Sequence, residues 1–531
     1  MQLARVARGA LGWFSESAPD DVSEDEVDDG EEEKHNASAS ASAGPISEWT
    51  ATTGDIQIPF SRLRHPAGPV LKQADAHLSE EGFFVKFLSP AIAKRIVDGT
   101  NAALPEGEHR LTTEELHAYL AVHIHMSLCS LPSITDYFHD EFKSTFVTEL
   151  FTQTRFVHLQ SSFAVVPLAE ANDAGDPIGP VRSFQTAMNA EFALHTPGGS
   201  FGALDEGGAA FKDRSDVKQF IPRKPHPHCF KIWCVSVRRH LQNFEIYEGK
   251  AAHSSSFGPM YDTVERLLSP FKDRGITFFI DSLFTSPAIL NKMAAIGIPI
   301  CGSVAKNRKG MPKLSIDPLK GQLERLERGQ RIELQKGDLN FVAWKDRTTM
   351  LMLYNHCQAS EITRVTRWGD RGRKTTLECP KAINDYFTHA RGVDVLNQLH
   401  YSYLLGRKSE RSCTRLKWWI IDMAIINAFE LWLLHHPGGT QLQFRIQLKN
   451  QLAAPHRAAQ LRVHNAVANA ANRCLPGALA CEHFSALSGF TGHCQICVYA
   501  DGTRTRTRHW CSGCRLSMCV GGCFSTFHSH I

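Results

Sequence analysis

The stretch "ITFFIDSLFTS", residues 276–286, joins a strand-like run to an acid. Ile276 to Ile280 are β-branched or aromatic, a composition typical of a buried strand. Asp281 follows directly. An aspartate at a strand end is commonly a turn former or a helix cap. A functional role for Asp281 therefore depends on which other residues lie beside it.

Residues 200–304, which surround this stretch, predict three consecutive strands followed by helix, strand, helix and strand. The strands are expected in "GSFGALDEGG", "HCFKIWCVSVRR", "LQNFEIYEGK", "ITFFIDSLF" and "IPICGSV". Two helix-like stretches, 261–273 and 287–295, flank the fourth strand. This is the element order of an RNase H-like α/β layer, although order alone is weak evidence of function.

Two further acids give Asp281 a chemical context. Asp205 is expected to end the first strand, in "FGALDEGG", and Asp394 lies in "ARGVDVLNQL", near the start of a helical region. In an RNase H-like sheet the first and fourth strands are neighbours, so Asp205 and Asp281 would meet at one sheet edge. A helix could then bring Asp394 to the same place. Three converging carboxylates would bind hard divalent cations such as Mg²⁺ or Mn²⁺, the arrangement that two-metal phosphoryl transfer needs.

The composition is that of a multidomain globular protein. The chain has 531 residues, of which 43% are hydrophobic and 21% charged, and this length predicts several packing units. No apolar run reaches the length of about 20 residues that a membrane span needs, so we expect no membrane partner. The N-terminal "MQLARVARGALGWF" lacks a long apolar core. We therefore expect no secretory signal and an intracellular protein.

The net charge of +3 hides an acidic leader. Residues 20–33 hold ten acids and no base, and "NASASASAG" follows. Such a segment buries too little apolar surface to offset its ordering entropy, so we expect disorder there. The remaining chain is basic. That distribution favours a polyanion partner, with which the leader could compete, or it marks a solubilising tail on an ordinary protein.

Six of the 15 cysteines fall within 30 residues near the C-terminus. Two CxxC pairs in a basic segment without an export signal favour zinc over disulfides, because thiolates at that spacing bind one tetrahedral ion. We expect two Zn²⁺ sites, with the assignment of histidines left open because His483, His493 and His509 also lie close by. The candidate ligands are Cys494, Cys497, Cys511, Cys514, Cys519, Cys523, His528 and His530.

Several motifs, in this order, resemble the piggyBac transposase family. They are "LDEGGAAFKDRSDVKQFIPRKPHPHCFKIW", "FFIDSLFTSPAILNKMAAIGIPICGSV", "FVAWKD" and "CPKAINDYFTHARGVDVLNQLHYSY", with the helical "ELHAYLAVHIHMSLCSLPSITDYF" before them and "HWCSGCRLSMCVGGCFSTFH" after them. The likeness covers roughly residues 75–531. Several ordered motifs make it more specific than one short pattern.

The resemblance implies an RNase H-like enzyme that cuts and joins double-stranded DNA at transposon ends and integrates at TTAA. The family's three catalytic aspartates correspond to Asp205, Asp281 and Asp394, which would hold Mg²⁺ (or Mn²⁺) in a DDD-type site. The resemblance also implies action in the nucleus, a homodimer, and a cysteine-rich domain that recognises the transposon ends.

The sequence departs from the family pattern beside the predicted site. Where the family usually has a further aspartate, this chain has Asn397, a candidate metal ligand that offers an oxygen without charge. Gly207 and Gly208 stand where bulkier residues are typical, and we expect them to loosen the strand end. These changes keep open a second hypothesis, a catalytically inactive, domesticated DNA-binding descendant.

The resemblance and the patterns together predict a multidomain α/β protein. An RNase H-like core would carry a strand-rich insertion, a mainly helical DNA-binding and dimerisation domain would form from two segments, and a zinc finger would follow. The predicted segments are a disordered acidic leader and linker 1–65, helical 66–199, catalytic 200–310, insertion 311–379, catalytic 380–404, helical 405–470 and zinc finger 481–531.

Basic residues in three places are candidate DNA contacts. Trp418 and Trp419 precede an apolar helix and are expected in the core. On the finger, alternating arginines in "DGTRTRTRHW" would project from one strand face. A zinc-dependent protein-binding adaptor is the third hypothesis for function, and it rests on the finger alone. The candidate phosphate contacts are Lys218, Arg223, Lys224, Lys408, Arg411, Arg415 and Lys417, followed on the finger by Arg504, Arg506 and Arg508.

Overall fold

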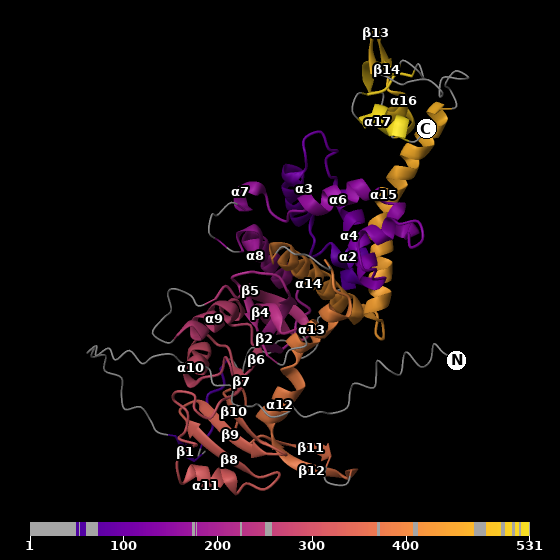
Figure 1. Ribbon diagram of the computed structural model, residues 1–531. Coiled ribbons are helices and arrows are strands. Elements are labelled where there is room, and N and C mark those ends of the chain that lie inside the picture. The colour runs from indigo at the N-terminus through magenta and orange to yellow at the C-terminus, as the bar shows by residue number, and fades with distance from the viewer. Residues whose placement is uncertain are drawn as a thin grey trace, which may run out of the picture.

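A computed structural model defines the fold (Figure 1). It describes residues 49–51, 54–59, 73–171, 176, 178–222, 226–249, 258–368, 372–406, 412–471, 485–500, 505–511, 516–519 and 522–529. The acidic run at 20–33 lies outside the described residues. No helix in the described ranges has the length and apolar character that crossing a bilayer would require.

A ten-stranded mixed sheet forms the centre of the molecule (Figure 1). The strand order is β1-β8-β9-β10-β7-β6-β2-β4-β3, with β5 paired to β4. The strands are β1 (Thr50–Ala51), β2 (Phe201–Ala210), β3 (Lys218–Phe220), β4 (His228–Val237), β5 (His240–Ile246), β6 (Thr277–Ile280), β7 (Ile300–Ser303), β8 (Arg331–Lys336), β9 (Leu339–Lys345) and β10 (Thr349–Tyr354).

The predicted order of strands and helices is confirmed. β2, β4 and β5 are joined by antiparallel pairing, and β6 and β7 then add in parallel, with α9 (Pro259–Leu268) and α10 (Pro287–Ala295) between them in sequence. The short β3, at the far end of β4, is an addition to that order. β2 and β6 are parallel neighbours, as the first and fourth predicted strands were expected to be.

Both faces of β4 are covered, which explains its almost continuous apolar sequence. Trp233, Val235 and Val237 pack in one cluster with α9 and α10. Phe230 and Ile232 pack on the opposite face in a second cluster that is shared with the helical part of the chain. The sheet is therefore the middle layer between two sets of helices.

The strand-rich block 311–379 divides into two parts. β8, β9 and β10 continue the central sheet, because β10 pairs antiparallel with β7. β11 (Ile362–Trp368) and β12 (Lys374–Pro380) form a separate antiparallel hairpin. The Trp344 indole on β9 donates a hydrogen bond to the Glu378 carbonyl at 3.0 Å and so ties the hairpin to the sheet.

Residues 49–51 and 56, which fall inside the predicted leader and linker 1–65, are folded onto this sheet. β1 pairs with β8, and the Trp49 indole donates to the Gly310 carbonyl at 2.9 Å. The Ile56 backbone exchanges two hydrogen bonds with the Gln358 side-chain amide, at 2.9 and 3.0 Å. Trp49 and Ile56 supply the apolar anchors that the acidic run lacks, which is why the chain docks here.

The two predicted helical segments come together around α14 (Ser412–His435), which is apolar on all sides. Trp418 and Trp419 are buried in this body, as predicted. The other elements are η1 (Gln73–Asp75), α2 (Glu80–Phe84), α3 (Pro90–Ala103), α4 (Thr113–Leu128), η2 (Thr135–Phe138), α5 (Thr145–Thr148), α6 (Gln153–Ser162), α7 (Leu168–Ala171), α8 (Gly179–Leu194), η3 (Ser269–Phe271), α11 (Leu319–Glu324), α12 (Lys381–His389), α13 (Gly392–Ser402), α15 (Gln441–Ala471), β13 (Ser485–His493), α16 (Gln495–Ala500), β14 (Arg506–Cys511) and α17 (Gly522–Ser529).

Amide side chains attach this helical body to the sheet at β5. Asn427 of α14 exchanges two hydrogen bonds with the Leu241 backbone, at 2.8 and 2.9 Å. Asn189 of α8 does the same with Phe244, at 2.8 and 3.0 Å. β5 is an edge strand, and these amides satisfy backbone groups that would otherwise lack partners.

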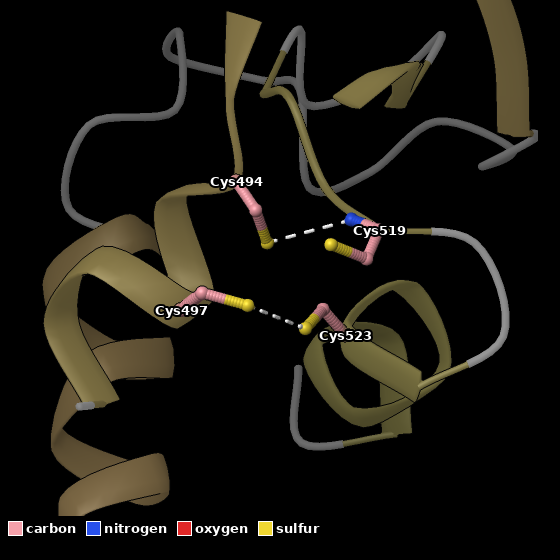
Figure 2. A group of neighbouring side chains, drawn as sticks. All are labelled: Cys494, Cys497, Cys519 and Cys523. Atoms are coloured by element: carbon pink, nitrogen blue, oxygen red, sulfur yellow. Dashed lines mark hydrogen bonds between the residues drawn. The ribbon is translucent and has the colours of Figure 1, made fainter. Parts of the chain in front are cut away.

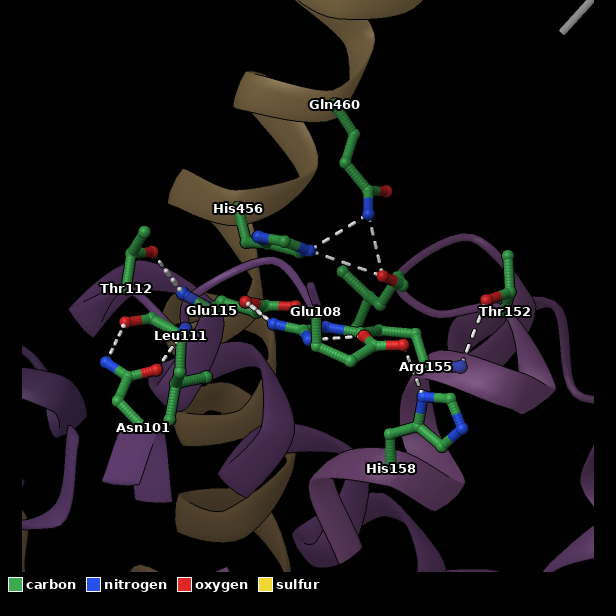
Figure 3. A network of polar contacts seen from close by, with 11 residues as sticks. Asn101, Glu108, Leu111, Thr112, Glu115, Thr152, Arg155, His158, His456 and Gln460 are labelled. Atoms are coloured by element: carbon green, nitrogen blue, oxygen red, sulfur yellow. Dashed lines mark hydrogen bonds and ion pairs between the residues drawn. The ribbon is translucent and has the colours of Figure 1, made fainter. Parts of the chain in front are cut away.

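A polar network joins α15 to the same body (Figure 3). Arg155 of α6 donates two hydrogen bonds of 2.8 Å to Glu115 of α4, and both side chains are largely buried. Gln460 of α15 donates to the Leu150 carbonyl at 2.7 Å. From there α15, roughly 45 Å long at 1.5 Å per residue, runs to the C-terminal elements (Figure 1).

Candidate functional site

Asp205 and Asp281 lie side by side on neighbouring parallel strands. The last registered pair of β2 and β6 is Leu204 and Ile280, so each aspartate is the next residue of its chain. Leu204 and Ile280 pack in the cluster with α9 and α10. Alternation along a strand therefore turns both aspartates toward the opposite face, on which α12 and α13 lie.

Asp205 does not end its strand, contrary to the prediction. β2 continues to Ala210 in antiparallel pairing with β4, whereas β6 stops after Ile280. The short β6 leaves the β2–β4 pair to project beyond it. Asp205 thus lies inside a continuous strand, which holds its backbone more firmly than a strand end would.

A tight turn fixes the backbone of Asp281. Its carbonyl accepts hydrogen bonds from the backbone N–H of Phe284 at 3.0 Å and of Thr285 at 3.2 Å, and from the Thr285 hydroxyl at 2.9 Å. Ser286 then caps α10 by accepting from the Ile289 N–H. The turn leaves the Asp281 side chain exposed, where its Oδ1 accepts a hydrogen bond of 3.1 Å from the Ser303 hydroxyl.

Helix α13 brings Asp394 to the same level of β2. The Asn397 amide donates to the Glu206 carbonyl at 3.1 Å, and the Tyr401 hydroxyl donates to the Gly208 carbonyl at 3.0 Å. Four helical residues rise about 6 Å, close to the rise of about 6.6 Å for two strand residues. One turn of α13 therefore matches about two residues of β2 in length. Because Asn397 lies opposite Glu206, Asp394, one turn earlier on α13, lies at the height of Asp205 along the strand.

Gly207 and Gly208 allow this close packing and do not loosen the strand, contrary to the prediction. A Cβ on Gly207 would lie 2.6 Å from the Cys234 sulfur and 3.7 Å from Asn397 Oδ1. A Cβ on Gly208 would lie 3.3 Å from the Tyr401 hydroxyl. Both glycines belong to the regular β2 strand. The small size of Gly207 leaves room for Cys234 on β4, and that of Gly208 leaves room for Tyr401 of α13.

Asp205 and Asp281 lie on one face of the sheet where β6 ends, with α13 and its Asp394 packed on that face, and the three acids do not form a compact cluster. Among the described residues, one set of His, Cys, Asp or Glu ligand atoms lies mutually within 4.8 Å, and that set is made of cysteines. Carboxylate oxygens are suitable donors for hard cations. In two-metal sites the ions lie about 3.5–4 Å apart, so the acids of such a site need not all reach one ion.

Ser303 and Tyr386 lie beside these acids and were not predicted from the sequence. Burial, followed by the nearby Asp281 and Asp205 carboxylates, raises the pKa of the Tyr386 phenol above its usual range. Tyr386 lies in "INDYF" and Ser303 in "ICGSV". The available signal was that Ser303 ends the strand next to that of Asp281, so both residues reach the same edge.

Three of the predicted phosphate contacts make hydrogen bonds to backbone carbonyls of the chain. Arg415 is 5% exposed, and its guanidinium donates to the Leu405 carbonyl at 2.9 Å. The Lys417 ammonium donates to the Phe163 carbonyl at 3.0 Å, and that of Lys218 donates to the Asp213 carbonyl at 2.6 Å. The remaining candidates, Arg223, Lys224, Lys408 and Arg411, lie outside the described residues.

The compact ligand set is a group of four cysteines in the C-terminal elements (Figure 2). Cys494, Cys497, Cys519 and Cys523 place their sulfur atoms within 4.8 Å of one another. Cys494 accepts a hydrogen bond from the Cys519 N–H at 3.4 Å, and the sulfurs of Cys497 and Cys523 are 3.5 Å apart. This set could hold a metal ion in tetrahedral coordination.

Because these sulfurs lie close together, the pKa of one cysteine is lowered and that of another is raised. A hydrogen bond from the Cys523 thiol lowers the pKa of Cys494 to about 4. Burial, with the neighbouring thiols, raises the pKa of Cys519 to about 12. Several thiolates at this spacing repel one another unless a cation lies between them.

A second ligand pair lies beside the first set. The Cys511 sulfur is 3.2 Å from Nε2 of His528, which identifies the histidine that faces this cysteine. Cys514 and His530, the other predicted ligands, lie outside the described residues. In sequence, Cys511 falls between the two halves of the four-cysteine set, and His528 follows both. The two groups are therefore interleaved along the chain.

Strand β14 presents the predicted basic face. Arg506 and Arg508 are exposed, whereas Thr507 between them is buried. This alternation is the period-2 pattern of a strand. Arg504, the first arginine of the predicted row, lies outside the described residues.

Comparison with known proteins identifies the family. A family model described as Transposase IS4 matches residues 79–429. Human PiggyBac transposable element-derived protein 3 is 22% identical over 360 residues, covering 65% of this chain and 60% of that protein. Human PiggyBac transposable element-derived protein 5 is 21% identical over 434 residues, covering 76% and 80%.

A solved structure shares the fold. It is the cryo-EM structure of a piggyBac transposase synaptic complex with hairpin DNA, with a TM-score of 0.62 and 20% identity, covering 75% of this chain and 84% of that one. This chain spans 60% of the length of the first relative. The match therefore does not show that this chain has the activity of that whole protein. With a mixed α/β fold, a large mixed sheet and a family match over most of its length, the chain belongs to the piggyBac-type transposase family.

Proposed function

We propose that this chain is a DNA transposase that cleaves and joins strands at transposon ends flanked by TTAA. The observation that carries the proposal is the placement of Asp205 and Asp281 on adjacent parallel strands with Asp394 level beside them. The family match supports the reaction class.

Asp205, Asp281 and Asp394 would hold Mg²⁺ or Mn²⁺. When bound, the ions supply a polarised nucleophile and stabilise the leaving oxygen during in-line displacement at phosphorus. The chain itself contributes rigid placement: β2 holds Asp205, the turn after β6 holds Asp281, and α13 carries Asp394. Little covalent chemistry is asked of the protein in such a reaction, so positioning is its main contribution.

Two exposed basic surfaces suit a duplex partner. One is the β14 face with Arg506 and Arg508. The other is the outer face of the β11–β12 hairpin, where Trp368 is 43% exposed and the Lys374 ammonium lies 5.0 Å from its ring centroid. Arg364 is also exposed on this face, opposite the exposed Glu378 on β12. Cations of this kind bind phosphates, and an exposed indole can stack on a base.

The proposal includes a zinc ion in the C-terminal elements, a homodimer and a nuclear location. Zn²⁺ is the ion that a set of four cysteines favours, and we assign it to the C-terminal elements. A homodimer would bring two transposon ends together, and the nucleus is where such ends are found. The solved piggyBac transposase is a synaptic complex with hairpin DNA, which supports the DNA partner and the pairing of ends.

A second candidate function, a silent DNA-binding descendant, is favoured by Asn397. This residue faces β2 with an amide, and its donor group is already used by the Glu206 carbonyl. An aspartate at position 397 would add a negative charge to the site, and the natural asparagine does not supply that charge. The two candidate functions differ in chemistry and share DNA binding.

Asn397→Asp should test which candidate holds. Without metal, the new carboxylate would face the Glu206 carbonyl, and we expect a loss of about 1–3 kcal/mol in stability. If the position lines a metal site, Mg²⁺ should restore the Tm of the variant while shifting the natural protein less. The assay for function is excision of a TTAA-flanked element with its own ends. If the natural protein and Asn397→Asp are both inert while duplex binding persists, the silent candidate is correct.

Removing residues 1–45 should strengthen duplex binding at low salt. The acidic run would no longer compete for the basic surfaces, and the cut lies before Trp49, so the docked segment stays. Affinity of both forms should fall steeply with salt, because each neutralised phosphate releases condensed counterions. Fluorescence anisotropy on a labelled duplex across a salt series measures both effects. Equal affinities for the two forms at every salt concentration would reject the competition.

A further inference from the structure

Ser303 contacts Asp281 from the neighbouring strand. Its hydroxyl donates to Asp281 Oδ1 at 3.1 Å. β6 and β7 are parallel with Ile280 beside Gly302, so Asp281 and Ser303 are the next residues of their chains and face each other across the strand ends. Within the described part of the chain, no hydrogen-bond partner is assigned to the second oxygen of Asp281, Oδ2. One carboxylate oxygen is therefore held and the other is open.

Tyr386 holds the Ser303 hydroxyl in turn. The Tyr386 hydroxyl donates to Ser303 Oγ over 3.4 Å, a long hydrogen bond. A serine hydroxyl has one proton and two lone pairs, so it can donate to Asp281 and accept from Tyr386 together. The three groups form one directed chain of hydrogen bonds, from Tyr386 through Ser303 to Asp281.

Helix α12 is anchored on both sides of Tyr386. Asp385 lies 3.2 Å from His356 Nε2 and 2.9 Å from the Lys381 ammonium, and the His356 side chain is buried. His389, one turn later, stacks on Phe201 of β2 with ring centroids 4.0 Å apart. These contacts leave Tyr386 little freedom to move away from the strand ends.

We propose that Ser303 is a positioning residue for the Asp281 carboxylate, with Tyr386 behind it, an inference that rests on the proposed metal-dependent function. Holding Oδ1 restricts rotation of the carboxylate and presents Oδ2 to a cation. Outer hydrogen bonds of this kind orient metal-binding side chains and raise metal affinity. In this proposal neither Ser303 nor Tyr386 contacts the ion or the DNA.

Metal binding without DNA provides the test. Mn²⁺ is titrated into zinc-loaded full-length protein, and unbound Mn²⁺ is followed by its electron paramagnetic resonance signal. Ser303→Ala should weaken Mn²⁺ binding about tenfold, and Tyr386→Phe about threefold. Ser303→Thr keeps the hydroxyl and should bind Mn²⁺ as the natural protein does. In the excision assay, Ser303→Ala should need more Mg²⁺ for half-maximal rate and reach nearly the same maximal rate.

Ser282→Ala is the matched control. Ser282 adjoins Asp281 and carries the same hydroxyl, but within the described residues that hydroxyl has no assigned contact with the carboxylate, so Mn²⁺ affinity should not change. If Ser303→Ala binds Mn²⁺ normally while Asp281→Asn loses binding, the positioning role is wrong and the metal site stands. If Asp281→Asn also binds normally, the metal site itself is wrong, and the positioning role falls with it.

Discussion

Asp281→Asn should abolish strand cleavage and joining while leaving duplex binding within about twofold of the natural protein. The change removes one negative ligand from the proposed site, and we expect a loss on the order of 10³-fold or more in cleavage rate. The basic surfaces that would hold the duplex lie on other elements, so affinity should persist. Excision of a TTAA-flanked element and anisotropy on the same end sequence measure the two properties separately.

Asp273→Asn is the control for this result. Asp273 is an exposed acid in the same domain, and its φ of 59° is a conformation that asparagine accepts readily. The charge change is identical, yet activity should stay near that of the natural protein. Asp205→Asn and Asp394→Asn should behave as Asp281→Asn does. Residual excision by Asp281→Asn at the natural rate would remove this aspartate from the mechanism.

The strand order and the placement of Asp281 were predictable because they depend on local signals. A run such as "ITFFI" is buried-strand sequence whatever surrounds it, and the alternation of strand and helix around it restricts the possible topologies. The likeness to piggyBac transposases added family and fold, and both are confirmed. The catalytic roles of Asp205, Asp281 and Asp394, like the segment boundaries, remain predictions.

Features that depend on long-range pairing were not predictable. β10 joins the central sheet through β7, and β1 joins β8 from nearly 300 residues away; nothing in their local sequence names the partner strand. Asp205 was expected to end its strand, but β2 continues through Gly207 and Gly208 in pairing with β4, and Gly208 leaves room for α13. Arg415 has the sequence context of a surface cation, but tertiary packing buries it against α13, where its guanidinium lies 3.5 Å from His400 Nε2.

The C-terminal elements should lose their structure when metal is removed. Their apolar core is small: among the residues whose burial the structure describes, it consists of Ile496, Met518 and Phe527 with the buried cysteines Cys494 and Cys511, and Leu516 and Phe524 pack against it partly buried. A core of that size cannot offset the ordering entropy of the segment, whereas zinc contributes about 10–16 kcal/mol in comparable small domains. A strong chelator should therefore open residues 485–529 of the full-length protein to protease while the central sheet and the helical body stay resistant.

The interleaving of the two ligand groups sharpens this expectation. Metal analysis should find about two Zn²⁺ per chain in the natural protein if both groups are complete. Cys511 lies on β14, between the halves of the four-cysteine set, so loss of either ion frees chain segments that the other ion needs. Cys494→Ser and Cys511→Ser should thus each release more than one equivalent of zinc, expose the segment and weaken duplex binding. Cys129→Ser, at an exposed cysteine of the helical body, should do none of these. If the segment keeps its protease resistance after chelation, metal is not what holds it together. If the Cys511→Ser variant retains one full equivalent of zinc and an ordered fold, the two ligand groups are independent.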